Sequence, residues 1–279
     1  CIRDRIKHIF LPLLLGVVLI YSCDDDNNTF VNPFADINHL ALSISDNDSI
    51  VQFLKNNYYD VATDSVKTLV SGEIALFDQK EKLTIIDAKR NELDYKLYIY
   101  HIKEGNPIHP DFGEASDDKG NPTIADSIYA KYSGQSILSS SELSPVFDSN
   151  TSGDWFSYER LAVRGWSFGF TTLKAGYLKK EDNGDTYNGP ITYLEGGKSI
   201  LFIPSGLSYT SINPNNYGST IVNQNLMFNV ELLDFVEFTD HDNDGRPSSE
   251  EDANEDGDLE NDFSDNSQPG VPDYLNQDI

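Results

Sequence analysis

Apolar and polar residues alternate along several stretches of the chain, and this alternation predicts β-strands. In YKLYIY, residues 95–100, the first, third and fifth side chains face one way and the others face the opposite way. A two-residue period of this kind is typical of a strand with one buried face. Further strands of one antiparallel set are predicted at SIYAKY, LFIP and LMFNVELL, which are residues 127–132, 201–204 and 226–233. LTII, residues 83–86, is the best strand of a weakly alternating stretch in an N-terminal extension.

Two segments have the spacing of a helix. Residues 46–49 offer N-cap candidates for a short amphipathic helix in IVQFLKNNYYD, where four apolar side chains share one face: Ile50, Phe53, Leu54 and Tyr58. The second segment, Trp166 to Lys174, has Trp166, Phe170 and Leu173 at i, i+4 and i+7. The proline-rich residues 106–122 form a connection.

The first residues have the pattern of an export signal. Arg3, Arg5 and Lys7 precede IFLPLLLGVVLI, an apolar run of twelve residues. The run is too short to span a bilayer and has the length of a signal-peptide core. It ends in LIYSC, which resembles the lipobox of bacterial lipoproteins, so Cys23 is the expected lipidation site. The alternative is an ordinary cleavage site beside a chance cysteine.

A lipidated Cys23 implies a protein anchored in the cell envelope, on the outer membrane. The acidic residues 24–26 resemble a surface-export signal of some gram-negative lipoproteins, and a periplasmic orientation is the alternative. The polar residues that follow, up to residue 35, suit a tether. With Cys1 removed and Cys23 acylated, no thiol remains for a disulfide.

The charge balance excludes nucleic acid as a partner. The formal net charge is −26, and residues 1–22 carry three basic residues against one acidic residue, so −28 remains on the rest. Phosphate binding requires a basic face. The 38% hydrophobic content of 279 residues is sufficient for a buried core. The histidines lack zinc-ligand spacing, and the serines of SSSEL, residues 139–143, do not lie in a G-x-S-x-G motif.

Much of the negative charge lies in residues 239–279, which hold fourteen Asp or Glu residues against Arg246. Carboxylates at this density repel one another when no cation is bound. A first stretch has the spacing of a calcium loop, with ligands at positions one, three, five and twelve: Asp240, Asp242, Asp244 and Glu251. A second stretch begins with the same spacing: Asp252, Asn254 and Asp256.

The closure of the second stretch is left open, because its twelfth position is Phe263. GVPDYL, residues 270–275, resembles the thrombospondin type 3 kind of calcium repeat. The resemblance implies calcium bound in this tail. The alternative is a disordered acidic tail with chance spacing.

Five short strings with aromatic residues follow one another between residues 131 and 235: KYSGQ, VFDSN, RGW, GGKSILFIPSGLSY and LMFNVELLDF. No single string is specific, but in this order and spacing they resemble FK506-binding-protein (FKBP) type peptidyl-prolyl isomerases. The resemblance implies an α+β fold, with a bent antiparallel sheet wrapped around one short helix. It also implies a pocket the size of a proline ring.

The resemblance assigns aromatic residues to the walls of that pocket. Trp166 is expected as the floor beneath the proline ring. The sides are expected from three more aromatic residues: Tyr132, Phe147 and Phe228. Phe156, in DWFSYE, is a further wall candidate, although its spacing to RGW is shorter than in the family. For any one of these residues alone, the alternative is ordinary core packing.

The same resemblance assigns polar roles at the pocket. The backbone N–H of Val163 and the hydroxyl of Tyr209 are expected to hold carbonyl oxygens of the bound peptide. Asp148 is expected near Tyr132, where it sets the polarity of the pocket edge. Thr210 replaces the glycine that the family has after Tyr209, and the following loop lacks the family's paired prolines. Residues 177–195 resemble an insertion. These departures concern substrate preference and catalytic strength.

The expected function is a peptidyl-prolyl cis-trans isomerase that acts on proline-containing segments of exported or outer-membrane proteins. It needs no cofactor for catalysis, since an aromatic pocket that desolvates and twists the amide suffices. One alternative is a peptide-binding chaperone or assembly factor without useful catalysis, and another treats the calcium tail as the working part. The predicted order is a lipoprotein signal peptide, tether, N-terminal extension, isomerase domain and acidic tail, at residues 1–22, 23–35, 36–91, 92–238 and 239–279.

Overall fold

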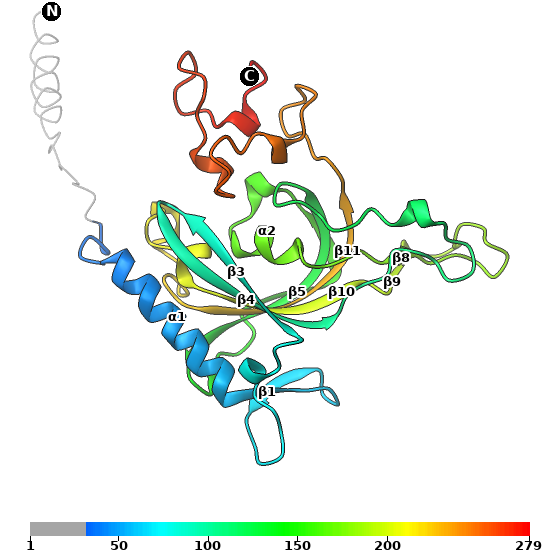
Figure 1. Ribbon diagram of the computed structural model, residues 1–279, viewed down its shortest axis with the longest axis horizontal. Helices are drawn as coiled ribbons and strands as arrows, with labels where there is room; N and C mark the ends of the chain where they lie inside the picture. The colour runs from blue at the N-terminus through cyan, green and yellow to red at the C-terminus, as the bar shows by residue number, and fades with distance from the viewer. Residues whose placement is uncertain (1–31) are drawn as a thin grey trace, which may run out of the picture. The chain divides into compact units, whose positions relative to one another are not determined.

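The computed structural model describes residues 32–279, and residues 36–279 form one compact unit (Figure 1). The predicted signal peptide, the lipidation site Cys23 and most of the predicted tether lie outside the described residues. Among the helices that the structure describes, none is long and apolar enough to cross a membrane.

A seven-stranded antiparallel sheet forms the centre of this unit. Its strands run in the order β3-β4-β10-β11-β5-β6, and β7 also pairs with β5. The strands span Leu83–Arg90 (β3), Leu93–Lys103 (β4), Ser127–Ser139 (β5), Glu142–Leu143 (β6), Asp148–Phe156 (β7), Gly197–Ile203 (β10) and Leu226–Val236 (β11). The strands predicted from the alternation of apolar residues are therefore confirmed, with β3 supplied by a segment ahead of the predicted isomerase domain.

Two small hairpins stand outside this sheet. Strands β1 (Asn57–Asp60) and β2 (Ser65–Thr68) form one, and β8 (Tyr177–Leu178) and β9 (Tyr193–Leu194) form the other. The second hairpin is made by the segment that resembles an insertion. Neither hairpin adds a strand to the central sheet.

Both faces of the central strands are buried, because a helix covers each side of the sheet. Along β10, Leu201 and Ile203 belong to the core around the short helix α2. Their neighbours Ile200 and Phe202 belong to a second core beneath the longer helix α1. In Figure 1 the two helices accordingly lie on opposite sides of the sheet, which curves around α2.

Strand β4 shows the predicted alternation, but neither of its faces is open to water. Leu97 and Ile99 join the core around α2, whereas Tyr98 and Tyr100 are buried in the core beneath α1. The expectation of a half-buried strand is wrong here, because α1 covers the second face with apolar residues such as Phe53. A long helix over the outer face was not expected.

Helix α1 spans His39–Asn56 and begins earlier than predicted. Its cap is Asn38, whose side-chain oxygen accepts the backbone N–H three residues on at 3.0 Å. The N-cap predicted at residues 46–49 is therefore wrong, and Asp46 is a buried residue of the helix interior. Tyr58 lies beyond the helix, in β1.

Helix α2, Gly165–Phe170, is the predicted short helix, but it ends four residues before Lys174. The hydroxyls of Thr171 and Thr172 donate to carbonyl oxygens of the last turn at 2.7 and 2.8 Å. These bonds satisfy carbonyls that a longer helix would use, so the helix can end there. The predicted α+β class is confirmed, with an antiparallel sheet around α2 and the longer α1 on its other face.

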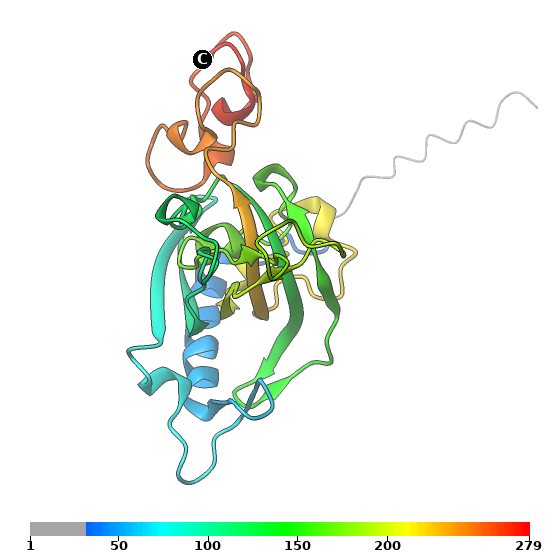
Figure 2. The ribbon, with the colours of Figure 1, turned by 90° about the vertical axis from the view of Figure 1, so that its right-hand side faces the viewer.

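The acidic tail, residues 239–279, folds into loops and short 3-10 turns at one end of the sheet (Figure 2). Those turns are η6 (Ser248–Glu250), η7 (Leu259–Asn261) and η8 (Asp273–Leu275). The rings of Tyr158 and Tyr274 meet edge to face with centroids 5.5 Å apart, and Leu259 is fully buried beside them. The tail therefore packs on the body through an apolar contact as well as through its charges.

Candidate functional site

A cavity of about 180 Å³ opens between the start of α2 and the strands β5, β7 and β11. This volume suits one small ring rather than a drug-sized ligand. Its lining combines aromatic, aliphatic and a few polar side chains: Tyr132, Asp148, Phe156, Arg160, Leu161, Ala162, Val163, Trp166, Tyr209 and Phe228. The described surface also has larger hollows beside α1, of about 580 and 630 Å³, but neither gathers several aromatic rings.

Trp166 is the centre of the aromatic lining. Its ring lies 4.9 Å from the ring of Tyr132 and 5.2 Å from those of Phe156 and Phe228, centroid to centroid. All three contacts are edge-to-face, an arrangement that aromatic quadrupoles favour. The buried indole N–H of Trp166 has no hydrogen-bond partner among the described residues. Trp166 is thus fixed from several sides and presents its indole to the cavity.

The close packing of α2 against β10 determines how near the Trp166 indole lies to the sheet. A Cβ atom on Gly165 would come within 2.6 Å of Ile203 Cγ2, and one on Gly169 within 2.7 Å of Leu201 Cδ1. Only glycine permits such an approach. The glycines on either side of Trp166 therefore let the helix sit directly on the sheet, which brings the indole to the base of the cavity.

The polar rim of the cavity has one satisfied pair and two free donors. The Tyr132 hydroxyl donates to Asp148 Oδ2 at 2.9 Å. Burial, together with this carboxylate, raises the pKa of Tyr132 to about 12, so the phenol stays neutral. Burial also raises the pKa of Tyr209. Among the described residues, neither the Tyr209 hydroxyl nor the Val163 N–H has a hydrogen-bond partner, so both remain available to a ligand.

The loop that carries Tyr209 is anchored by α1. Asp46 Oδ2 accepts hydrogen bonds from the backbone N–H and the hydroxyl of Ser205, at 2.9 and 2.6 Å. Asn225, just before β11, donates to the Asp46 carbonyl at 3.3 Å. Burial raises the pKa of the Asp46 carboxyl to about 6, and these hydrogen bonds offset part of that rise. Both ends of the loop are therefore held by one helix residue.

The structure brings most of the predicted pocket residues together. Six line the cavity: Tyr132, Asp148, Val163, Trp166, Tyr209 and Phe228. Phe147 is outside the lining and packs edge to face on Phe228, with centroids 5.8 Å apart. Phe156, the further wall candidate, does line the cavity. Residues 160–162 also line it and were not predicted, because this connecting segment has no distinctive pattern.

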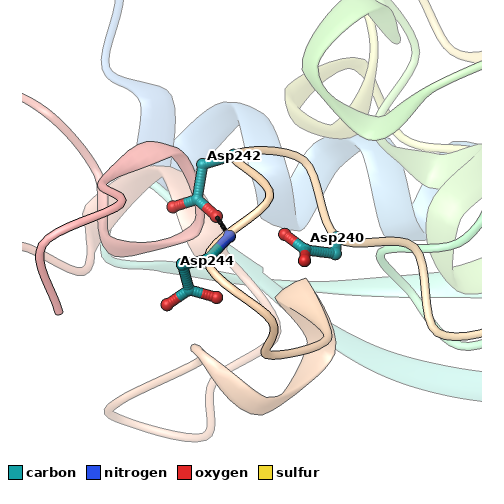
Figure 3. A group of neighbouring side chains, drawn as sticks. All are labelled: Asp240, Asp242 and Asp244. Carbon is teal, nitrogen blue, oxygen red and sulfur yellow. Dashed lines mark hydrogen bonds between the residues drawn. The ribbon is translucent and has the colours of Figure 1, made fainter.

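The first acidic loop gathers three carboxylates (Figure 3). Oxygens of Asp240, Asp242 and Asp244 lie within 4.8 Å of one another. Asp242 is 6% exposed and Glu251 is 3% exposed. One oxygen of Asp242 and both oxygens of Glu251 are buried without a hydrogen-bond partner among the described residues. Burying carboxylate oxygens in this way is costly, and a calcium ion satisfies such oxygens, so these residues fit one.

The second acidic loop closes at a residue that the sequence pattern missed. Asp252 accepts hydrogen bonds from the N–H groups of Asp256 and Gly257, at 3.1 and 2.8 Å, which folds the loop. Asp262, at the eleventh position, is 4% exposed and has one oxygen without a partner among the described residues. Phe263, at the twelfth position, is instead exposed. The buried carboxylate at the end of this loop thus lies one position before the twelfth.

In each loop, burial and the neighbouring carboxylates disfavour ionisation of the buried carboxyl group. Burial, followed by the carboxylates of Asp242 and Asp244, raises the pKa of Glu251 to about 7. Burial, followed by Asp252 and Asp256, raises the pKa of Asp262 to about 6. Both closing residues thus face the acidic side chains that begin their loops. A bound divalent cation reverses this balance and favours the ionised forms.

No protein-family model and no curated protein matches the chain. Among solved structures, it is similar to a peptidyl-prolyl cis-trans isomerase from Pseudomonas syringae pv. tomato, with 13% identity and a TM-score of 0.39 over 72% of this chain and 98% of that chain. It is also similar to FkpA from Escherichia coli, with 19% identity and a TM-score of 0.35 over 58% of this chain and 55% of that chain. A multi-domain immunophilin from Arabidopsis thaliana has 16% identity and a TM-score of 0.34 over 55% and 48% of the two chains.

Proposed function

We propose that the protein is a peptidyl-prolyl cis-trans isomerase whose active site is the cavity around Trp166. The observation that carries the proposal is the set of edge-to-face rings around one buried indole, in a cavity of about 180 Å³. A proline ring is apolar and small enough for such a cavity. No nucleophile or metal is needed at such a site, because the reaction is a rotation and no bond is broken.

The physical task is to lower the barrier to rotation about the X–Pro amide. That barrier is about 18–20 kcal/mol, because the planar amide loses its resonance as it twists. The twisted amide has less charge separation than the planar one, so a cavity that removes water favours the transition state over the ground state. A reduction of about 4 kcal/mol gives roughly a thousandfold acceleration. Aromatic walls can supply an environment of this kind.

Specific groups on the rim suit the binding of the peptide around the proline. The free N–H of Val163 and the neutral hydroxyl of Tyr209 are donors for two peptide carbonyl oxygens. The Tyr132–Asp148 pair places a carboxylate at the edge of the cavity, close to the bond that must twist. These groups orient the peptide, while Trp166 contacts the proline ring.

The test is the rate of cis-to-trans isomerisation of proline tetrapeptides with varied residues before the proline, with the full chain as catalyst. Asp148→Ala removes the carboxylate of the rim, and Asp154→Ala, an exposed Asp on the same strand, is its matched control. We expect acceleration that falls in the Asp148 variant and persists in the Asp154 variant. If the folded protein accelerates no peptide, the catalytic proposal fails. Peptide binding without acceleration would then identify a peptide-binding chaperone.

We further propose that the acidic tail binds calcium and that the protein is anchored to the cell envelope by a lipid on Cys23. The unpartnered carboxylate oxygens of Asp242, Glu251 and Asp262 support calcium binding, and isothermal titration calorimetry measures it. The lipobox-like LIYSC string supports the anchor. Incorporation of labelled fatty acid that is lost in Cys23→Ala tests it. The expected substrates are proline-containing segments of exported proteins.

A further inference from the structure

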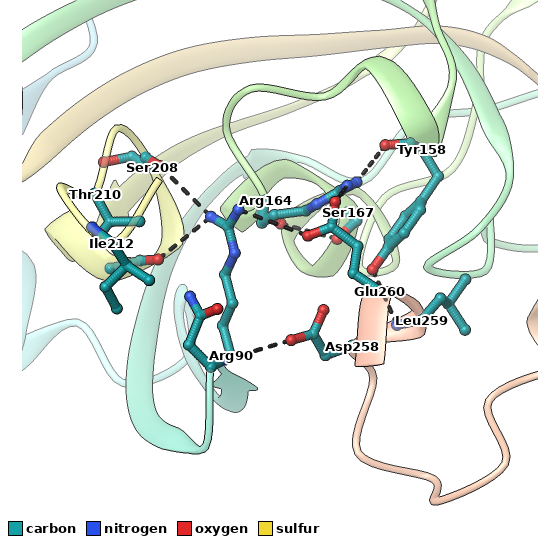
Figure 4. A network of polar contacts seen from close by, with 12 residues as sticks. Arg90, Tyr158, Arg164, Ser167, Ser208, Thr210, Ile212, Asp258, Leu259 and Glu260 are labelled. Atoms are coloured by element: carbon teal, nitrogen blue, oxygen red, sulfur yellow. Dashed lines mark hydrogen bonds and ion pairs between the residues drawn. The ribbon is translucent and has the colours of Figure 1, made fainter. Parts of the chain in front are cut away.

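One carboxylate of the acidic tail, Glu260, lies between two arginines of the body (Figure 4). Its Oε1 accepts a hydrogen bond from Arg164 Nη2, and its Oε2 lies 3.7 Å from Arg90 Nη2. Arg164 is 3% exposed, and Arg90 is largely buried. Burying a guanidinium is costly unless an opposite charge accompanies it. Glu260 supplies that charge to both arginines.

Arg164 holds one wall of the cavity. It stands directly between Val163 and the first residue of α2, and its carbonyl accepts the N–H and the hydroxyl of Ser167 at 3.1 and 2.8 Å. Its other guanidinium nitrogen donates to the carbonyl of Tyr158. The segment that carries Val163 and Trp166 is therefore tied to the position of this guanidinium.

Arg90 reaches toward the opposite wall. Its Nη1 donates to the carbonyl oxygens of Gly206 and Ser208 at 3.4 and 3.5 Å. These residues lie three and one positions before Tyr209, which lines the cavity. One tail carboxylate thus contacts two arginines, which in turn contact the segments on two sides of the same cavity.

Glu260 belongs to the second acidic loop, which contacts the body closely. The Leu259 N–H donates to the Tyr158 hydroxyl at 3.2 Å. Gly257 has a φ of +81°, and a Cβ at this position would come within 2.8 Å of Phe168 on α2. Without a cation, repulsion among Asp252, Asp256 and Asp262 opposes closure.

We propose that a calcium ion held by the second acidic loop and closed in by Asp262 places Glu260 between Arg164 and Arg90, so that Glu260 acts as a positioning residue for the pocket. This inference rests on the proposed isomerase function. Coupling of this kind changes affinity by about 5- to 150-fold, and it is reciprocal, so a bound proline peptide strengthens calcium binding by the same factor. Calcium is thereby an effector of the pocket as well as a part of the tail.

The test compares three variants. Glu260→Gln removes the charge that contacts both arginines, and Asp262→Asn removes the closing ligand. Glu255→Gln is the matched control, because Glu255 is an exposed carboxylate of the same loop with no side-chain partner among the described residues. All are made in a Trp155→Phe background, which leaves Trp166 as the sole tryptophan. The readouts are kcat/KM for a proline tetrapeptide, Trp166 emission and calcium stoichiometry.

In the background protein and in the Glu255 control, we expect calcium to raise kcat/KM, to raise the affinity for the peptide by about 5- to 150-fold, and to change Trp166 emission. The Glu260 variant should bind as many calcium ions and lose these responses. The Asp262 variant should bind one ion fewer and also lose them. A Glu260 variant that responds like the control, or an Asp262 variant with full stoichiometry, overturns the proposal.

Two features keep this test distinct from that of the proposed function. If no protein isomerises any peptide at saturating calcium, the isomerase proposal fails, while Trp166 emission still decides whether Glu260 couples the tail to the pocket. If circular dichroism shows that the Glu260 variant does not fold, the coupling is tested instead on the unmodified protein, by measuring its calcium affinity with and without a proline peptide. Its calcium affinity should then rise with saturating proline peptide, and an unchanged affinity counts against the coupling.

Discussion

The aromatic pocket and the acidic tail differ in the kind of buried polar group that lacks a hydrogen-bond partner within the protein. Around Trp166, rings pack edge to face, and the Tyr132 hydroxyl has its carboxylate partner. In the tail, Asp242, Glu251 and Asp262 bury carboxylate oxygens that have no partner among the described residues. At the centre of the pocket the unpaired buried group is a neutral donor, the Trp166 indole N–H, whereas the tail buries unpaired carboxylate oxygens, which a bound cation would satisfy. Stability should respond differently to a change in each region.

The largest effect on stability is expected for Trp166→Ala, which removes the central ring of the aromatic pocket. Removing a large buried aromatic side chain typically costs about 3–5 kcal/mol of unfolding free energy, because contacts are lost and a cavity remains. Trp155→Ala is the control, since that side chain is 48% exposed and should cost well under half as much. Urea unfolding followed by far-UV circular dichroism measures both. Equal losses for the two tryptophans would contradict the central place given to Trp166.

The next effect concerns Asp46, the one acidic side chain that anchors the pocket loop. Its pKa rises from an ordinary 3.8 to about 6 in the folded protein, mainly because the carboxyl is buried. At about 1.4 kcal/mol for each pKa unit, the rise corresponds to at most about 3 kcal/mol. Because the folded state binds the proton more tightly, this term lowers stability as pH rises from about 4 to about 6, and acidification restores it.

The variant Asp46→Asn should therefore show a flatter dependence of unfolding free energy on pH between 4 and 7. Both proteins are measured with calcium chelated, so that the carboxylates of the tail are free of cations in each. The neighbouring Tyr95 stays neutral throughout this range, because burial, with Asp46 nearby, raises its pKa to about 12. Parallel curves for the two proteins would show that Asp46 does not titrate as described.

Calcium should stabilise the protein by an amount that depends on its concentration. A ligand at one hundred times its dissociation constant adds about 2.7 kcal/mol for a single site. Glu251→Gln should remove the part of this gain that belongs to the first loop, and Glu250→Gln, an exposed neighbour, should not. Differential scanning calorimetry with calcium and with chelator is the measurement. An unchanged melting temperature would mean that the tail is complete without cations.

The smallest effect is expected at the pocket rim. Tyr132→Phe removes one hydroxyl and its bond to Asp148 but keeps the ring on Trp166. A hydrogen bond of this kind contributes about 1 kcal/mol net, so kcat/KM for a proline peptide should fall about fivefold. Tyr129→Phe, on the same strand and outside the cavity lining, serves as control. A loss of stability without a change in kcat/KM would give Tyr132 a structural role only.

The parts of the molecule that the sequence predicted are those with local patterns. Alternation located the central strands, and the order of the aromatic strings located Tyr132, Trp166 and Phe228 on one cavity. The beginning of α1 was missed because the mostly polar residues 43–49 separate its first turn, capped by Asn38, from the apolar periodicity near Ile50. A local pattern reports burial along one element and says little about where that element starts.

The parts that were missed depend on distant partners. Arg164 and Glu260 are 96 residues apart, and nothing near either residue indicates the other. Asp262 was overlooked because the calcium-loop template expects its last ligand one position later. Tyr98 and Tyr100 were expected on an open face because the helix that covers them lies elsewhere in the chain. Such contacts are decided by tertiary packing.

Strand β11 also determines how the molecule responds to mechanical load. It pairs with β5 along its length on one side and with β10 over residues 226–232 on the other, and the first acidic loop begins four residues after its end. A pull on the C-terminus would first extend the tail and then act on this doubly paired strand. Because the tail consists of loops and short turns, we expect it to yield to such a load before the sheet does, and a cation bound in its loops would raise the force that it withstands.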